Sequence, residues 1–205
     1  MAAMLDIIYS MVLGSVLLLT VIDSNQIASE NHSMYNGDML VQELLIGTAQ
    51  LLEGELKNMG FGVPENHQTV MDADTGRISF LVDLGRDGGL IDTVTYVVGP
   101  ISELSNTMNE LDRYLYRKRN GDAPQQVGIV TILRFRYLNV VGEELSTPVD
   151  STQLTEIYIV EVTMEVQNPY AIYRDPRQVR PGERDALYSS SLWQQTRLAS
   201  QNSRR

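Results

Sequence analysis

The sequence predicts an α+β fold in which a long N-terminal α-helix packs against a small antiparallel β-sheet head, followed by an extended basic C-terminal arm. An apolar run over residues 4–22 leads into a helical repeat of apolar side chains. Beyond Gly60 the pattern changes to the alternation of β-strands, and prolines and arginines are frequent in the last part of the chain. These changes divide the 205 residues into a helix over 1–60, a β-rich head over 61–170 and an arm over 171–205.

The apolar run, MLDIIYSMVLGSVLLLTVI, has the length of a membrane span, which takes roughly 17 to 25 helical residues. No basic residue precedes it and no small-residue cleavage site ends it, so it is not an ordinary secretory signal. The first basic residue of the chain is Lys57, which leaves only the terminal amine for the positive-inside rule to act on.

A second helical segment, over residues 39–59, is amphipathic and is followed by Gly60 and Pro64, which end it. Its apolar stripe, with spacings of three and four residues, consists of Val41, Leu45, Thr48, Leu52, Leu56 and Met59, widened by Leu40, Leu44 and Leu51. The pair Asn36-Gly37 between the two segments is more typical of a turn. The sequence favours one continuous helix over residues 4–59, about 84 Å long at ~1.5 Å per residue. Two helices that meet near this pair are the alternative.

The sequence of the head predicts antiparallel strands. Residues 77–84 and 91–98 are rich in branched and aromatic side chains and predict a hairpin closed by the turn at 85–89. Two longer strands are expected over residues 128–138 and 154–166, and the second alternates so regularly that one apolar face should pack on the helix. Shorter elements are expected between the hairpin and these strands: helix or loop over 102–113 and a short strand over 114–117.

The head contains no pattern that predicts catalysis or metal binding. Residues 83–92 have the acids and glycine of a calcium loop, but Gly85 and Val94 stand where oxygen ligands are required, so a hairpin turn is preferred. The chain has no cysteine, and its two histidines, His32 and His67, are far apart in sequence. We therefore expect no enzyme activity, no cofactor, no metal and no small-molecule substrate.

The charge is uneven along the chain. The formal net charge is -10, divided as -6 over residues 1–60, -8 over 61–170 and +4 over 171–205. This balance argues against nucleic acid as a partner. The basic arm is expected either to pack on an acidic head, its own or a neighbour's, or to be solvated, and Trp193 is predicted to anchor it. The charged residues Asp112, Arg113, Arg117, Lys118 and Arg119 are expected in a solvated loop.

Asp6 is the single charge inside the apolar run, where an acid is costly unless it is paired or functional. It either serves as a cap-like acid at the positive end of the helix dipole or meets a cation of a neighbouring chain, for which an identical neighbour offers its terminal amine. We predict that Asp6 and the apolar residues around it form an assembly surface. The predicted residues are Leu5, Asp6, Ile7, Ile8, Val12, Leu13, Val16, Leu17, Leu18 and Leu19.

An apolar N-terminal helix with an acid near its start, continuing as an amphipathic helix under a small sheet, resembles the type IV pilin superfamily. The segments 50–64 (QLLEGELKNMGFGVP), 83–96, 133–138 and 157–166 are similar to the heads of minor pilins and type II secretion pseudopilins. Mature chains of that family have a glutamate at the fifth position, which Asp6 would occupy if Met1 were removed. This chain departs from the family in having Asp for Glu, no basic leader ending in glycine and no aromatic first residue. These differences leave open whether a leader peptide is removed.

The resemblance implies a structural subunit of a helical filament, with bundled apolar helices in its core and heads on the outside. The implied partners are identical or homologous subunits, with the inner membrane as the location before assembly and the cell surface or an extracellular filament after it. One alternative is a permanently membrane-anchored accessory subunit of a membrane or secretion complex with an exported head. A virion or other tubular structural protein is a further alternative.

Overall fold

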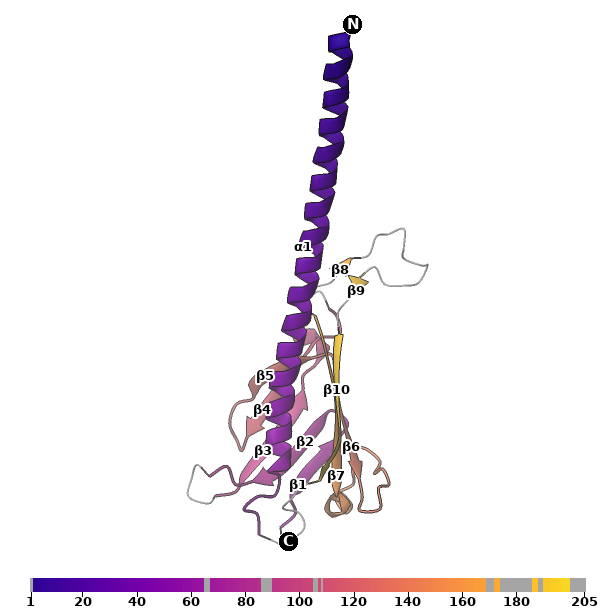
Figure 1. The fold of residues 1–205 in the computed structure, drawn as a ribbon. Coiled ribbons are helices and arrows are strands. Elements are labelled where there is room, and N and C mark those ends of the chain that lie inside the picture. The colour runs from indigo at the N-terminus through magenta and orange to yellow at the C-terminus, as the bar shows by residue number, and fades with distance from the viewer. Residues whose placement is uncertain are drawn as a thin grey trace.

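A computed structural model gives one long helix followed by antiparallel β-structure (Figure 1). The residues that the structure describes are 2–64, 67–85, 90–104, 107, 109–168, 172–173, 186–187 and 190–199. The expected α+β fold class, a long N-terminal helix with an antiparallel sheet head, is confirmed.

Helix α1 spans Ala2–Lys57 without a break, so the interpretation as one continuous helix is confirmed. Its 56 residues correspond to a length of about 84 Å. The pair Asn36-Gly37, which is typical of a turn, lies inside this helix. The structure gives another reason for a glycine at this position. A Cβ atom at Gly37 would lie 2.1 Å from Nδ2 of Asn168, so this glycine allows the head to approach the helix closely.

The two halves of α1 have different surroundings. The N-terminal half projects from the head (Figure 1), and every side chain that the structure describes from Met4 to Asn36 is exposed. The C-terminal half lies against the head and buries the predicted stripe. Its most buried members are Val41, Thr48, Leu52, Leu56 and Met59, each at most 4% exposed, whereas Leu40 at its edge is 36% exposed.

The first sheet has five antiparallel strands in sequential order. They are β1 (Val70–Asp74), β2 (Arg77–Val82), β3 (Asp92–Val98), β4 (Arg113–Arg119) and β5 (Gln125–Val130). The predicted hairpin is β2 and β3, which pair from Arg77 opposite Val97 to Val82 opposite Asp92. The predicted short strand is β4. Strand β1 was not expected, because its five residues include two aspartates and no long apolar run.

The second sheet has the order β10–β7–β6, formed by β10 (Ser190–Ala199), β7 (Ile159–Gln167) and β6 (Ile132–Leu138). The prediction of one strand over 128–138 was wrong, because the chain leaves β5 at Thr131 and enters the other sheet as β6. The buried Thr131 donates its backbone N–H to the carbonyl of Glu165 at this corner.

The strand predicted over 154–166 begins five residues later than expected. Residues Leu154–Glu156 form the 3₁₀-helix η2, which buries Leu154. From Ile159 onward the predicted alternation is confirmed, with Val160, Val162, Met164 and Val166 at most 1% exposed. A second 3₁₀-helix, η1 (Ile101–Leu104), lies in the segment expected to be helix or loop.

Part of the expected arm belongs to the β-structure. The two-residue strands β8 (Ile172–Tyr173) and β9 (Ala186–Leu187) pair with each other. Strand β10 pairs antiparallel with β7 from Ser190 opposite Gln167 to Ala199 opposite Ile159. The C-terminal segment therefore docks through its backbone on the chain's own head over residues 190–199.

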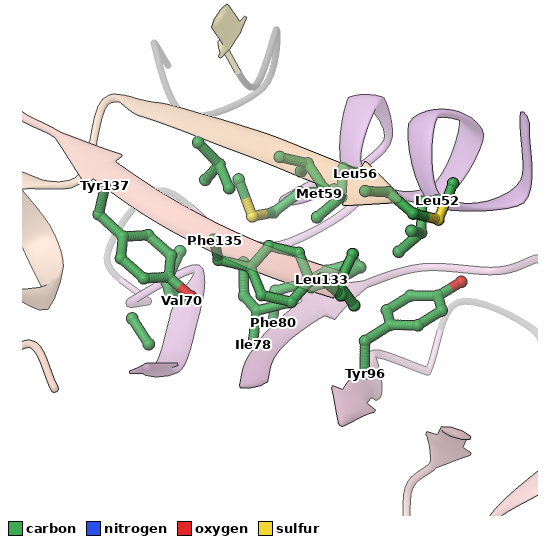
Figure 2. Close-up of a cluster of buried hydrophobic side chains, with 14 of the residues drawn as sticks. Leu52, Leu56, Met59, Val70, Ile78, Phe80, Tyr96, Leu133, Phe135 and Tyr137 are labelled. Atoms are coloured by element: carbon green, nitrogen blue, oxygen red, sulfur yellow. The ribbon is translucent and has the colours of Figure 1, made fainter. Parts of the chain in front are cut away.

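One apolar core lies between α1 and the inner faces of the two sheets. Figure 2 shows Leu52 and Leu56 of the helix beside Leu133 and Phe135 of β6, with Phe80 beneath them. Burial of each such side chain contributes about 1.5–3 kcal/mol to folding. The head thus supplies a partner for the C-terminal half of α1, whereas the described side chains from Met4 to Asn36 stay exposed.

Candidate assembly helix

The predicted assembly residues lie on the projecting half of α1. Eight of them have exposed fractions between 53% and 65%: Ile7, Ile8, Val12, Leu13, Val16, Leu17, Leu18 and Leu19. Seen along the helix axis they surround the helix instead of forming one stripe, which is typical of a helix enclosed by lipid or by other helices. The side chain of Leu5 lies outside the described residues.

Exposure of this surface to water is costly. Full burial of eight aliphatic side chains contributes on the order of 10–20 kcal/mol, comparable to the whole stability of a domain. Among the described residues, α1 is the one helix that is long and apolar enough to cross a membrane by length and composition. The apolar segment therefore requires an apolar environment beyond its own head.

Asp6 has no ion pair with any residue that the structure describes, and it is exposed on the helix surface. The first basic residue along α1, Lys57, is 51 positions away, which corresponds to about 77 Å of helix. Because α1 begins at Ala2, Asp6 lies after the first turn, where the helix dipole has little effect. This position weakens the cap-like alternative and favours a cation from outside the helix.

A partly buried polar cluster clamps the far end of α1 to the first sheet. Arg117 of β4 donates from Nε to both carboxylate oxygens of Glu55 at 2.9 Å, and Tyr96 of β3 donates its hydroxyl to Glu55 at 2.6 Å. The side chains of Arg117 and Glu55 are 16% and 17% exposed. Burial, and secondarily the Glu55 carboxylate, raises the pKa of Tyr96, and the same carboxylate raises the pKa of Arg117. The cluster fixes the rotation of α1 relative to the head.

A second ion pair holds the edge of the hairpin. Asp92 is 3% exposed and accepts hydrogen bonds from Nε and Nη2 of Arg119, both at 3.0 Å, and from Asn120 at 2.7 Å. The hydrogen bond from Arg119 is the largest cause that lowers the pKa of Asp92. The last acid of the segment that had the composition of a calcium loop is thus engaged by protein donors.

The expectation of a solvated loop was wrong for residues 117–119, which lie in strand β4, and for Asp112. Asp112 is 1% exposed, and neither carboxylate oxygen has a hydrogen-bond partner among the residues that the structure describes. Burial raises the pKa of this carboxyl group. Nearby in sequence, Asn109 is also 1% exposed and donates from Nδ2 to Oε1 of Gln167 at 2.9 Å, which ties the loop to the end of β7.

The structure brings none of the predicted assembly residues that it describes into the head. A cavity of about 580 Å³ lies at the end of the head remote from the projecting helix. It is lined by residues 59–64, 67–70, 83, 154, 155 and 157.

Trp193 lies in β10 opposite Met164, but its side chain is outside the described residues. Its role as the anchor of the arm stays a prediction.

No protein-family model matches this chain, and no curated protein matches it. Among solved structures, a type IV-like pilin from Thermus thermophilus is similar, with 14% sequence identity and a TM-score of 0.43. The similarity covers 80% of this chain and 97% of that protein. The arrangement expected from the sequence, a long N-terminal helix partly covered by an antiparallel head, is present in α1 and the two sheets themselves.

Proposed function

We propose that this protein is a structural subunit of a pilin-like helical filament. The apolar N-terminal halves of α1 from many copies form the core, and the β-rich heads form the outer wall. The observation that carries this proposal is the segment 4–22 of the projecting half of α1, which is apolar on all sides, exposed, and continuous with a helix clamped to a folded head. Its partners are identical or homologous subunits.

Before assembly the same segment resides in the membrane, which on this proposal is the inner membrane. Transfer into the filament exchanges lipid contacts for helix–helix contacts, and such packing is driven by van der Waals contact and interhelical polar groups. The assembled filament then lies at the cell surface or outside the cell. No nucleic acid, small-molecule substrate or catalytic step is part of this mechanism.

Asp6 supplies the polar contact of the bundle. A carboxylate surrounded by apolar helices is stable only when a cation neutralises it. The first basic side chain of its own helix is about 77 Å away, so the cation comes from a neighbouring chain. The terminal amine of an identical neighbour is the group that we expect in this role.

The second candidate is a permanently anchored accessory subunit of a membrane or secretion complex. It is supported by the same apolar segment, whose length equals that of a single membrane span. The two functions differ in the fate of the chain after membrane insertion. An anchored subunit stays soluble only in detergent, whereas a filament sediments without it.

The test is electron microscopy and sedimentation of the full-length chain after expression in a bacterial membrane and removal of detergent. Filaments in which this chain is the repeating unit are expected. Particles that remain single subunits or small complexes under these conditions would favour the anchored subunit.

Asp6→Ala tests the mechanism in the same assay. We expect a folded head, shown by an unchanged unfolding midpoint in detergent, together with at least tenfold fewer filaments. Asp6→Glu is the control that keeps the carboxylate and should assemble. Normal filaments from Asp6→Ala would contradict the pairing of Asp6 with a neighbour.

A further inference from the structure

The apolar stripe that packs under the head continues beyond it without a partner among the described residues. Val41 is 1% exposed, but Met34 and Ile27, one and two heptads earlier on the same face of α1, are 45% and 59% exposed. At ~100° per residue all three project within about 20° of Met34. The first residue of α1 that is buried among those described is Gly37, which faces Asn168.

Each exposed apolar residue of this stripe follows an acid by four positions. Asp23 precedes Ile27, Glu30 precedes Met34, and both acids project within about 40° of Met34. Neither acid forms an ion pair with any residue that the structure describes; Glu30 accepts a hydrogen bond from Gln26 at 3.1 Å. The segment therefore presents a repeated pair, an apolar side chain and a carboxylate about 6 Å apart along the axis.

A complementary pair lies on the outer face of β6. Ile132 is 43% exposed, and Arg134, two residues later on the same face of the strand, is also exposed. Strand β6 runs away from the projecting end, so Arg134 lies about 6.6 Å farther from that end than Ile132. Glu30 lies in the same direction from Ile27, about 4.5 Å along α1. Arg134 forms no ion pair within the described part of the chain, and the residue opposite it on β7 is the uncharged Thr163.

The acids near Arg134 are already engaged. Glu161 accepts a hydrogen bond from Arg136 at 2.9 Å, and Glu165 accepts one from Gln167 at 2.9 Å. Lys118, on the first sheet, also has no described ion pair but is only partly exposed. Arg134 is therefore the best-placed exposed cation among the described residues for an external carboxylate.

We infer that the stripe of Ile27 and Met34 on one copy binds the outer face of β6 on a second copy, with Ile132 against Ile27 and Arg134 against Glu30. The contact joins two different surfaces of identical chains, so it repeats from copy to copy and builds an open helical assembly. This inference rests on the proposed filament function. It identifies the contact between the head of one copy and helix α1 of another copy in the filament.

The contact predicts how far the two copies are offset. Ile132 pairs with Glu165, three strand residues or about 10 Å from Asn168, which marks the level of Gly37 on the helix. Ile27 and Glu30 lie about 15 and 10 Å beyond Gly37 on the projecting side. The second head is therefore shifted toward the projecting end by roughly 25 Å.

Disulfide cross-linking tests the contact directly, because the chain has no cysteine. Full-length Ile27→Cys and Ile132→Cys chains, each with a different tag, are mixed in membranes and oxidised. We expect at least a fivefold greater yield of the mixed disulfide than with Ser29→Cys replacing Ile27→Cys. Ser29 is the matched control, since it is exposed at nearly the same level of α1 and projects about 160° away from Ile27.

Charge reversal tests the same contact in the assembly assay. Arg134→Glu should raise the concentration needed for filaments roughly fivefold to tenfold, Glu30→Arg should do the same, and the double variant should return within about threefold of the wild type. Lys118→Glu makes an equal charge change on the other sheet and should assemble normally. Equal behaviour of Arg134→Glu and Lys118→Glu, or no recovery in the double variant, would overturn the inference.

The two assays separate this inference from the function on which it rests. Filaments with no preferential cross-link from Ile27→Cys would leave the filament function intact and refute this contact. A preferential cross-link in membranes without any filaments would support the contact and refute the filament function.

Discussion

The close approach of the head to α1 at Gly37 can be tested by a pair of glycine substitutions within one helix. Gly54→Ala should raise the free energy of unfolding by about 0.5–1 kcal/mol, because alanine has the higher helix propensity and nothing lies within 4 Å of the added Cβ. Gly37→Ala gains the same helix propensity, but its Cβ would lie 2.1 Å from Nδ2 of Asn168.

Asn168 is 4% exposed, so its side chain has little room in which to move. Displacing a buried amide from its hydrogen bonds costs about 1–3 kcal/mol, and the strain of an overpacked contact is of the same size. We therefore expect Gly37→Ala to lower the free energy of unfolding by about 1–2 kcal/mol, a difference of roughly 2–3 kcal/mol between the two variants.

The assay is urea unfolding of the head in the full-length chain, held in detergent and followed by circular dichroism of the β-structure. Gly47→Ala is a second control, since nothing lies within 4 Å of its Cβ either. An equal gain of stability in Gly37→Ala and Gly54→Ala would refute the close approach of Asn168 to the helix.

Two further predictions concern the polar groups of the head. Glu55→Gln removes the carboxylate that Arg117 and Tyr96 share, and should lower the free energy of unfolding by about 2–4 kcal/mol, whereas Glu53→Gln, in a more exposed pair, should change it by less than about 1 kcal/mol. Similar losses in both variants, measured by urea unfolding, would contradict the clamp. Asp112 has a raised pKa in the folded head, so it contributes stability at pH values below its unfolded pKa and this contribution is lost as pH rises through the folded pKa. Asp112→Asn should therefore stabilise the head at pH 7, and this gain should shrink toward pH 4; a gain of equal size at both pH values would indicate a cause other than ionisation.

The elements that the sequence predicted well are those whose pattern comes from one unbroken packing partner. The stripe from Val41 to Met59 faces a single core, and the alternation after Ile159 in β7 faces the same core, so both periods are visible in the residue types. Gly37 shows the opposite case. Its residue type is compatible with a turn or with a close contact, and only the position of Asn168 decides between them.

The split of the predicted strand over 128–138 has a similar cause. Val130 is buried, and the buried set then changes phase at Thr131, continuing at Leu133, Phe135 and Tyr137. Branched and apolar residues occur both before and after this change of phase. The residue types therefore do not reveal that the chain passes from one sheet to the other at Thr131. Asp112 could not be placed from sequence either, because acids are so seldom buried without a partner that a solvated loop is the better prior.

The unbroken course of α1 links the clamp in the head to the surfaces of the projecting half. Each residue of helix adds about 100° of rotation and 1.5 Å of rise, so the rotation set at Glu55 determines which side every residue back to Asp6 presents. Without a bend at Asn36-Gly37, the direction of the head and the direction of the stripe of Ile27 and Met34 are fixed relative to each other. A hinge there would let each head adopt its own angle, and a contact that repeats from copy to copy would lose its register. The glycine that looked like a break in the sequence instead closes the head onto a rigid helix, which is the geometry that a regular assembly requires.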